Sequence, residues 1–304
     1  MLAYLLTAIG AMSLIMLTLK FFSAKQIYTP QAIMVNYLFA FVLALVQGHS
    51  GLSADRLHAL LTTDWWYLAL LTGLLYFGSM NVMAVSTRRV GVAVTAMASR
   101  TSVVLPIIWA ALLLGERITG WEAAGILLVL LAFALIIGGP AAPAAAPTSG
   151  HPTRTAWWLP AGVFFSVGFI AVCMKTGQHL IRNGGSYAAD YPVFETLLFA
   201  AAVIGSIGYY ALTEGRRAFR PRWRSIVGGL CLGTFNYFVT FGTLHSLKYL
   251  SSSEFYGIYN ISVVVISTVV GVAAFGERLT PRKIGGLIVA LAAIFVLGFV
   301  GGSL

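Results

Sequence analysis

Two charged residues stand inside long apolar stretches of the sequence, Arg100 and Glu195. A charge within a membrane span costs about 3 kcal/mol, so it usually faces a cavity or a partner. The Arg100 guanidinium suits a substrate carboxylate or phosphate, with a structural ion pair or a snorkelling side chain as the alternative. The Glu195 carboxyl group suits proton coupling. A permanent salt bridge to Arg100 or Lys175 is its alternative.

Two lysines end apolar stretches, Lys20 the first and Lys175 the sixth. Each either snorkels to the membrane interface or faces a cavity, and their matched positions favour the cavity. Further polar and aromatic residues interrupt the apolar stretches, and each is either a helix–helix hydrogen bond or a ligand contact. Together with Arg100, Lys20 and Lys175, they form the predicted substrate-binding set: Asn36, Tyr37, Tyr76, Asn81, Ser99, Asn236, Tyr237, His245, Tyr256, Tyr259 and Asn260.

The composition places these residues in a membrane protein. The 304 residues are 59% hydrophobic and 9% charged, whereas a soluble domain is about 25% charged. The net charge of +10 comes from short turns between apolar stretches, which indicates membrane orientation and no nucleic-acid binding. The histidines and cysteines show no metal-ligand spacing, so neither a metal nor a cofactor is expected.

The apolar stretches predict an all-α bundle, because only helices or closed barrels satisfy the backbone in lipid and these runs are too long for barrel strands. Turn chemistry agrees, with a capping box at Thr119–Glu122 and an N-cap at Thr280 before Pro281. Ten membrane-spanning helices are predicted: Leu2–Phe22, Gln31–Gln47, Trp66–Ser86, Gly91–Leu114, Trp121–Gly139, Trp157–Lys175, Ala188–Leu212, Ser225–Leu247, Ser252–Phe275 and Ile284–Gly301.

The chain contains an internal duplication. The turn Gly115–Thr119 (GERIT) recurs as Gly276–Thr280 (GERLT), 161 residues later, and the same offset places Gly125 on Gly286. It also pairs Tyr76 with Tyr237, whereas Lys20 falls on Lys175 at an offset of 155. We expect two five-helix repeats, residues 1–139 and 156–304, joined by a linker over 140–155 rich in proline and alanine. Both GER turns are interpreted as structural, with Glu116 and Glu277 pairing with the adjacent arginines or with helix ends.

Five helices per repeat give the second repeat the opposite direction across the membrane. Inverted repeats are typical of secondary transporters, whose sites lie near the midplane between the repeats. Basic residues are concentrated on one side, above all in the turn 214–224. The positive-inside rule therefore predicts that this side is cytoplasmic and that both termini lie outside. The start of the sequence is apolar and lacks a basic segment, so we expect no cleaved signal peptide.

Duplicated five-helix units, a lysine after the first helix of each, and GER turns after the fourth and ninth helices resemble the drug/metabolite transporter superfamily, in particular its EamA-type members. The resemblance covers nearly the whole chain. It implies export of small polar metabolites such as amino acids out of the cell, across the cell (inner) membrane. It also implies a central cavity formed by helices one to four and six to nine. Many relatives carry an arginine in the second helix, where this chain has Asn36 and Tyr37.

The sequence favours a secondary transporter of a small polar or amphipathic metabolite, working by alternating access as a monomer. A lipid-carrier or lipid flippase of the same fold is the first alternative. A membrane-embedded enzyme is the second, but the chain has no GxSxG, no HExxH and no paired intramembrane aspartates. No phosphate-binding GxxxxGK[ST] loop is present, so energy is expected from an ion or solute gradient.

Overall fold

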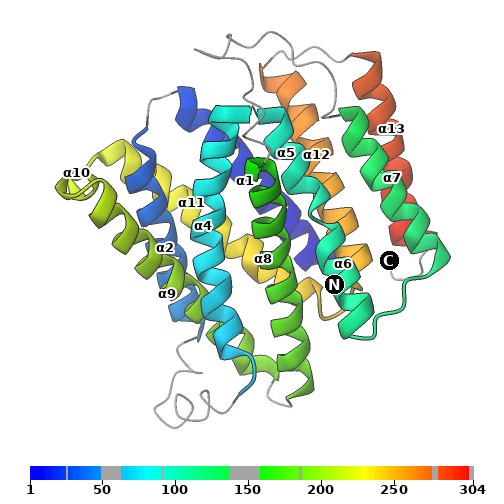
Figure 1. Ribbon diagram of the computed structural model, residues 1–304, viewed down its shortest axis with the longest axis horizontal. Coiled ribbons are helices and arrows are strands. Elements are labelled where there is room, and N and C mark those ends of the chain that lie inside the picture. Colours follow the sequence, from blue (N-terminus) through cyan, green and yellow to red (C-terminus); the bar gives the residue numbers. More distant parts are fainter. Residues whose placement is uncertain are drawn as a thin grey trace. The chain divides into compact units, whose positions relative to one another are not determined.

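A computed structural model describes residues 1–24, 27–48, 63–90, 92–136, 158–184, 187–275 and 280–300. These residues form helices and turns, and no strand occurs among them. The predicted linker 140–155 and the second GER turn up to residue 279 lie outside the described residues. In chain order the helices are α1 (Leu2–Ala24), α2 (Thr29–Gly48), α4 (Trp66–Val90), α5 (Val92–Thr101), α6 (Val104–Leu113), α7 (Gly120–Ile136), α8 (Trp158–Asn183), α9 (Tyr187–Thr213), α10 (Arg216–Phe219), α11 (Trp223–Ser246), α12 (Ser252–Phe275), α13 (Pro281–Phe295) and the π-helical turn η2 (Val296–Val300) (Figure 1).

The helices are suited to a bilayer. Within the described part of the chain, eight segments are long and apolar enough to cross a membrane. The apolar parts of α1 and α7, Leu2–Thr18 and Gly120–Ile136, are shorter. Large apolar side chains point outward along several helices, including Leu212, Leu112 and Ile204, which indicates lipid contact. The protein is therefore a multi-pass α-helical membrane protein, and the count of ten crossings stays a prediction.

Two of the predicted helices differ from the observed ones. The predicted helix Gly91–Leu114 is interrupted between α5 and α6, because Pro106 cannot donate a backbone hydrogen bond. Tight turns precede the proline, with Leu105 N donating to Ser102 O over 3.0 Å. The predicted end of a helix at Lys175 is wrong, since α8 continues to Asn183. The polar residues after Lys175 lower the hydropathy but do not stop a helix.

The chain divides into two compact units that each draw on both halves of the sequence. Unit 1 comprises Met1–Phe77 and Cys173–Tyr249, and unit 2 comprises Gly78–Val172 and Leu250–Leu304. The boundaries fall inside α4 and α8, so these two helices contribute to both units.

Unit 1 is built around α11, which packs against α1 and α2, while α2 also packs against α9. Glycines allow these helices to approach closely. A Cβ atom on Gly233 would lie 2.6 Å from the backbone oxygen of Asn36, and one on Gly242 would lie 2.7 Å from that of Tyr4. The backbones of α11, α1 and α2 are thus in direct contact.

Unit 2 contains a reciprocal contact between α7 and α13, which lie side by side in Figure 1. A Cβ atom on Gly125 would lie 2.6 Å from the side chain of Leu297, and one on Gly286 would lie 2.6 Å from that of Ile136. The 161-residue offset converts Gly125 into Gly286 and Ile136 into Leu297. The same contact is therefore made twice, with the roles of the two helices exchanged.

Helix caps in unit 2 confirm the turn chemistry expected from the sequence. Thr119 N donates to Glu122 Oε2 over 2.8 Å and Glu122 N donates to Thr119 Oγ1 over 3.2 Å, which completes the capping box of α7. Thr280 Oγ1 accepts from Lys283 N over 3.3 Å and caps α13. In the first GER turn, Glu116 Oε2 accepts from Ser252 N at the start of α12 over 2.9 Å. Glu116 thus pairs with a helix end, as interpreted from the sequence.

We expect Glu116→Gln to destabilise the protein by about 1 kcal/mol, because it removes a negative charge from the N-terminus of α12. Thermal unfolding of the purified protein in detergent measures this loss. The exposed neighbour Arg117 supplies the control: Arg117→Gln should leave the unfolding temperature unchanged. Equal unfolding temperatures for Glu116→Gln and the unmodified protein would contradict the cap.

Candidate functional site

Unit 1 brings four polar side chains from three helices into one buried series. Asn236 Nδ2 of α11 donates to Asn36 Oδ1 of α2 over 3.4 Å. Thr240, one turn further along α11, donates to the Asn236 backbone oxygen over 3.1 Å. Its hydroxyl lies 3.3 Å from the hydroxyl of Tyr76 in α4. Three of the predicted substrate-binding residues, Asn36, Tyr76 and Asn236, are therefore neighbours.

Two further tyrosines of the predicted set lie in unit 1. The Tyr237 hydroxyl donates to Gln47 Oε1 of α2, and its ring stacks at 6.2 Å from that of Phe241. Tyr37 is fully buried, and its hydroxyl has no hydrogen-bond partner within the described part of the chain. A buried hydroxyl without a partner is costly, and a bound ligand or water would relieve that cost.

Glu195 of α9 is completely buried, and neither carboxylate oxygen has a hydrogen-bond partner among the described residues. Lys248 of unit 1 supplies a nearby cation, and its ammonium group lies 3.8 Å from the ring centroid of Tyr191. Burial lowers the pKa of Lys248, and the Glu195 carboxylate acts in the opposite direction by favouring the ammonium form. The carboxyl group therefore interacts with a cation at the end of α11.

His245 lies among aromatic rings beside this pair. Its ring centroid is 4.1 Å from that of Phe241, 5.0 Å from that of Tyr4 and 5.6 Å from that of Tyr191. Its Nδ1 atom lies 2.9 Å from the Phe241 backbone oxygen, one turn earlier in the helix. These ring contacts hold the imidazole in place. Tyr191, one of the rings, also contacts the Lys248 ammonium group.

Unit 2 contains the other part of the predicted set. Arg100 is only 9% exposed, and its Nη1 atom donates to Asn260 Oδ1 over 2.9 Å. Asn260 Nδ2 donates in turn to the Tyr256 backbone oxygen over 2.9 Å. The Tyr256 hydroxyl donates to the Ala171 backbone oxygen of α8 over 2.9 Å. Arg100 stands one residue before the end of α5, so the cation lies at the break between α5 and α6.

The remaining predicted residues have separate surroundings. Tyr259 stacks on Phe255 with ring centroids 5.4 Å apart, and Ser99 is half-buried with its carbonyl accepting from Ser102 over 2.7 Å. Asn81 is half-buried in α4, and Lys175 is 4% exposed within α8. The side chain of Lys20 lies outside the described residues.

Sequence reasoning missed three residues of the unit 1 cluster: Gln47, Thr240 and Lys248. Thr240 lies one turn from the predicted Asn236 in α11, and Gln47 of α2 accepts a hydrogen bond from the predicted Tyr237 of α11. Only the packing of the helices brings them into the cluster. Lys248 follows a predicted span directly and was counted with the loops. The available signal was only that Lys248 is a basic residue directly after an apolar run. Among the described residues, no group of three His, Cys, Asp or Glu side chains could hold a metal ion.

Comparisons with known proteins agree with a helical membrane protein of the transporter class. Residues 1–138 match the model of the EamA-like transporter family, which is part of the drug/metabolite transporter superfamily. This confirms the resemblance recognised from the sequence. Members of such transporter families are generally not enzymes.

Two whole-chain similarities accompany the family match. An uncharacterised protein of Haemophilus influenzae is 26% identical over 289 residues, covering 92% of this chain and 91% of that protein. A protein of known crystal structure shares the fold with a TM-score of 0.70 and 16% identity, covering 98% of this chain and 96% of its own. Neither similarity identifies a substrate.

Proposed function

We propose that this protein is a secondary transporter that exports a small polar or amphipathic metabolite, such as an amino acid, across the cell (inner) membrane. Transport proceeds by alternating access around a central cavity between two inverted five-helix repeats. The observation that carries the proposal is Arg100, a permanent cation buried at a helix break with a neutral amide as its hydrogen-bond partner. The family match of residues 1–138 supports the same class.

Arg100 is suited to an anionic group for reasons of charge and geometry. The bond to Asn260 orients the guanidinium without neutralising it. A carboxylate accepts two parallel hydrogen bonds from a guanidinium, and such charge-assisted pairs are the stronger class. In transporters of known architecture, substrate sites commonly lie where membrane helices are interrupted. The α5–α6 break next to Arg100 supplies this feature.

The reciprocal contact of α7 with α13 supports inverted repeats. Gly125 lies near the start of α7 and touches Leu297, beyond the end of α13, whereas Gly286 near the start of α13 touches Ile136 at the end of α7. The two helices are therefore antiparallel, and the repeat equivalents of Gly125 and Leu297, which are Gly286 and Ile136, form the second contact. A two-fold axis perpendicular to both helices generates this pattern.

Glu195 is the proposed proton-coupling residue, with Lys248 as its countercharge within unit 1. The protonation state of a buried carboxyl group without hydrogen-bond donors among the described residues depends strongly on the cations around it. If the substrate or a conformational change alters that balance, Glu195 takes up or releases a proton. Substrate and proton are then linked through one charge balance.

Removing the Arg100 cation should weaken substrate binding. We expect Arg100→Ala to reduce affinity at least tenfold, and Arg100→Lys to recover little, because an ammonium group cannot form the bidentate contact. A thermal-shift screen of a metabolite library first identifies the ligand, since a ligand stabilises the state it binds. Titration of that ligand then compares the variants.

Arg117→Ala is the matched control, because it removes an exposed arginine from a turn of the same unit. Its affinity should equal that of the unmodified protein. Wild-type affinity and transport in Arg100→Ala would assign Arg100 a structural role. A screen that returns only long-chain lipids would instead indicate a flippase.

Replacing Glu195 should separate exchange from coupling. In proteoliposomes, Glu195→Gln imitates the protonated carboxyl group, so substrate exchange between two loaded sides should continue. Accumulation driven by a pH gradient should fall to the level seen without a gradient. Gradient-driven accumulation equal to that of the wild type would exclude Glu195 as the coupling site.

The orientation follows from the basic turn between α9 and α11, which is placed in the cytoplasm. We therefore expect alkaline phosphatase, which is active outside the cytoplasm, to be active when fused at Leu304. A fluorescent protein, which is active in the cytoplasm, should be active when inserted after Phe219. Alkaline phosphatase and a fluorescent protein provide the two readouts. The opposite pattern would invert the orientation.

A further inference from the structure

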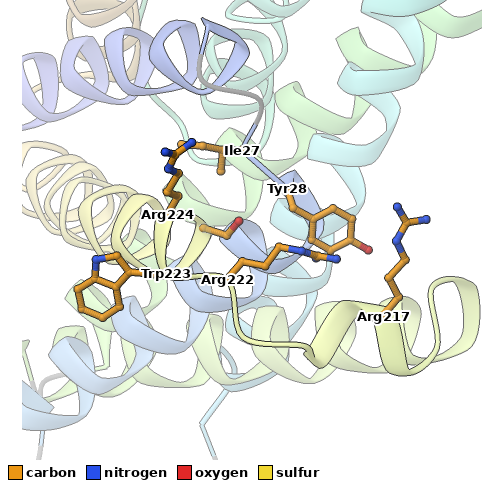
Figure 2. A pocket seen from close by; sticks show the side chains of 7 residues that line it. Ile27, Tyr28, Arg217, Arg222, Trp223 and Arg224 are labelled. Atoms are coloured by element: carbon orange, nitrogen blue, oxygen red, sulfur yellow. The ribbon is translucent and has the colours of Figure 1, made fainter.

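A pocket of about 480 Å³ lies in unit 1, and none of the residues assigned to transport lines it. It is lined by Ile27, Tyr28, Arg217, Arg222, Trp223, Arg224 and Ser225 (Figure 2). Three of these seven residues are arginines and none is acidic. Figure 2 shows Arg222 extending toward Tyr28 and Trp223 extending the opposite way. The volume is within the range of about 300–1,000 Å³ that small ligands occupy.

Arg222 is held in place with a hydrogen-bond donor unused. Its guanidinium carbon lies 3.9 Å from the centroid of the Tyr28 ring, a cation–π contact. Its backbone N–H donates to Gln31 Oε1 over 3.0 Å, while Gln31 Nε2 donates to the Arg220 backbone oxygen over 2.8 Å. The Nη1 atom is buried and has no partner among the described residues. A buried guanidinium nitrogen without an acceptor is costly, and an anion would supply the acceptor.

The surroundings of Arg222 are strongly positive. The segment 214–224 contains five arginines and one carboxylate, Glu214. That carboxylate is occupied by the Tyr28 hydroxyl, which donates to Glu214 Oε2 over 2.7 Å. Burial, and then the interaction with Glu214, raises the pKa of Tyr28, so the phenol keeps its proton and remains the donor. The guanidinium carbon of Arg217 lies 5.9 Å from the centroid of the same ring.

A helix terminus adds to this positive potential. The 24-residue helix α11 begins at Trp223, and no side chain caps its N-terminus. The first residues of α11, Trp223 to Ser225, line the pocket. The N-terminus of a long helix carries a partial positive charge and donor groups that favour an anion.

The position along the chain places the pocket at headgroup depth. Tyr28 directly precedes the span Thr29–Gln47, and Arg222 directly precedes the span Trp223–Ser246. The α2 and α11 helices pack on each other, so these two span ends are adjacent. Trp223 is 76% exposed, and tryptophan is enriched at the membrane–water interface. An occupant of the pocket would therefore lie at the depth of the lipid phosphate groups.

We propose that this pocket binds the phosphate of an anionic phospholipid headgroup, with Arg217 and Arg222 as its ligands on either side of Tyr28. The phosphate oxygens accept from both guanidinium groups, and the N-terminus of α11 faces the same anion. Trp223 lies at the interface beside the acyl chains. The site is independent of the transported substrate and of Arg100, which belongs to unit 2.

The observations favour a lipid over a soluble anion. Basic clusters directly beside a membrane helix attract anionic lipids by about 1 kcal/mol for each charge near the surface. A lipid is also present at this depth at high local concentration, whereas a soluble phosphate must be drawn from dilute solution. Both share the phosphate, so the experiment has to separate them.

The test measures thermal unfolding of the full-length protein in neutral detergent during titration with dimyristoyl phosphatidylglycerol. Dimyristoyl phosphatidylcholine, with the same chains and no net charge, is the control lipid. Inorganic phosphate is the soluble arm. We expect phosphatidylglycerol to stabilise the protein at a concentration at least tenfold lower than phosphatidylcholine does. We expect inorganic phosphate at millimolar concentration to have little effect.

The variants locate the effect. Arg217→Gln and Arg222→Gln should each raise the phosphatidylglycerol concentration needed by about tenfold, which corresponds to about 1.4 kcal/mol. Arg117→Gln removes the same charge from an exposed turn outside the pocket and should behave as the wild type does. Arg217 is exposed, so its replacement decides the outcome even where Arg222→Gln does not fold.

Three results would overturn the proposal. Equal stabilisation by the two lipids would remove the charge dependence. Equal stabilisation by inorganic phosphate would make the occupant a soluble anion. An equal loss in Arg117→Gln would show that overall charge, and not the pocket, attracts the lipid.

Discussion

The arrangement of unit 1 depends on the direct backbone contact of α11 with its neighbours. Gly233 allows α11 to approach α2 so closely that any side chain there would meet the Asn36 backbone oxygen. The 3.4 Å bond between Asn236 and Asn36 is made one turn from this contact. Widening the gap by a methyl group would break that bond and displace Thr240 from Tyr76. Lipid tails give helices no hydrophobic reason to associate, so close packing has to position the polar groups.

This close packing explains why the buried polar groups fall into two classes. Asn36, Asn236, Thr240 and Tyr76 form hydrogen bonds with one another across α2, α4 and α11, and such neutral bonds stabilise helix association. The charged groups are less well satisfied: Glu195 lacks hydrogen-bond donors among the described residues, and Arg100 is bonded to a neutral amide. An ionic group that is buried without full compensation is costly to the fold. The proposed roles of Arg100 in substrate binding and of Glu195 in proton coupling would account for that cost.

The sequence predicted the features that depend on local chemistry. Hydropathy located the helices, and the bounds of Ser252–Phe275 agree with α12. The Thr119–Glu122 and Thr280 caps agree because capping needs only neighbouring residues. Pro106 was visible in the sequence, yet hydropathy alone joined α5 to α6. Lys175 was assigned to a helix end because an apolar window stops there. The partnership of Lys248 with Glu195 joins residues 53 positions apart and depends on packing that no local pattern contains.

The repeat provides a link between sequence and packing that local patterns lack. The 161-residue offset was taken from a turn motif, from aligned aromatic residues and from the match of Gly125 with Gly286. The same offset also maps Leu297 onto Ile136, so it relates the two glycine contacts between α7 and α13 to each other. Because the two contacts are equivalent when α7 and α13 exchange roles, each helix needs a glycine and a large apolar residue at matched positions. The proposed duplication would supply both at once, because one sequence pattern, repeated in inverted orientation, places a glycine and a large apolar residue on each helix.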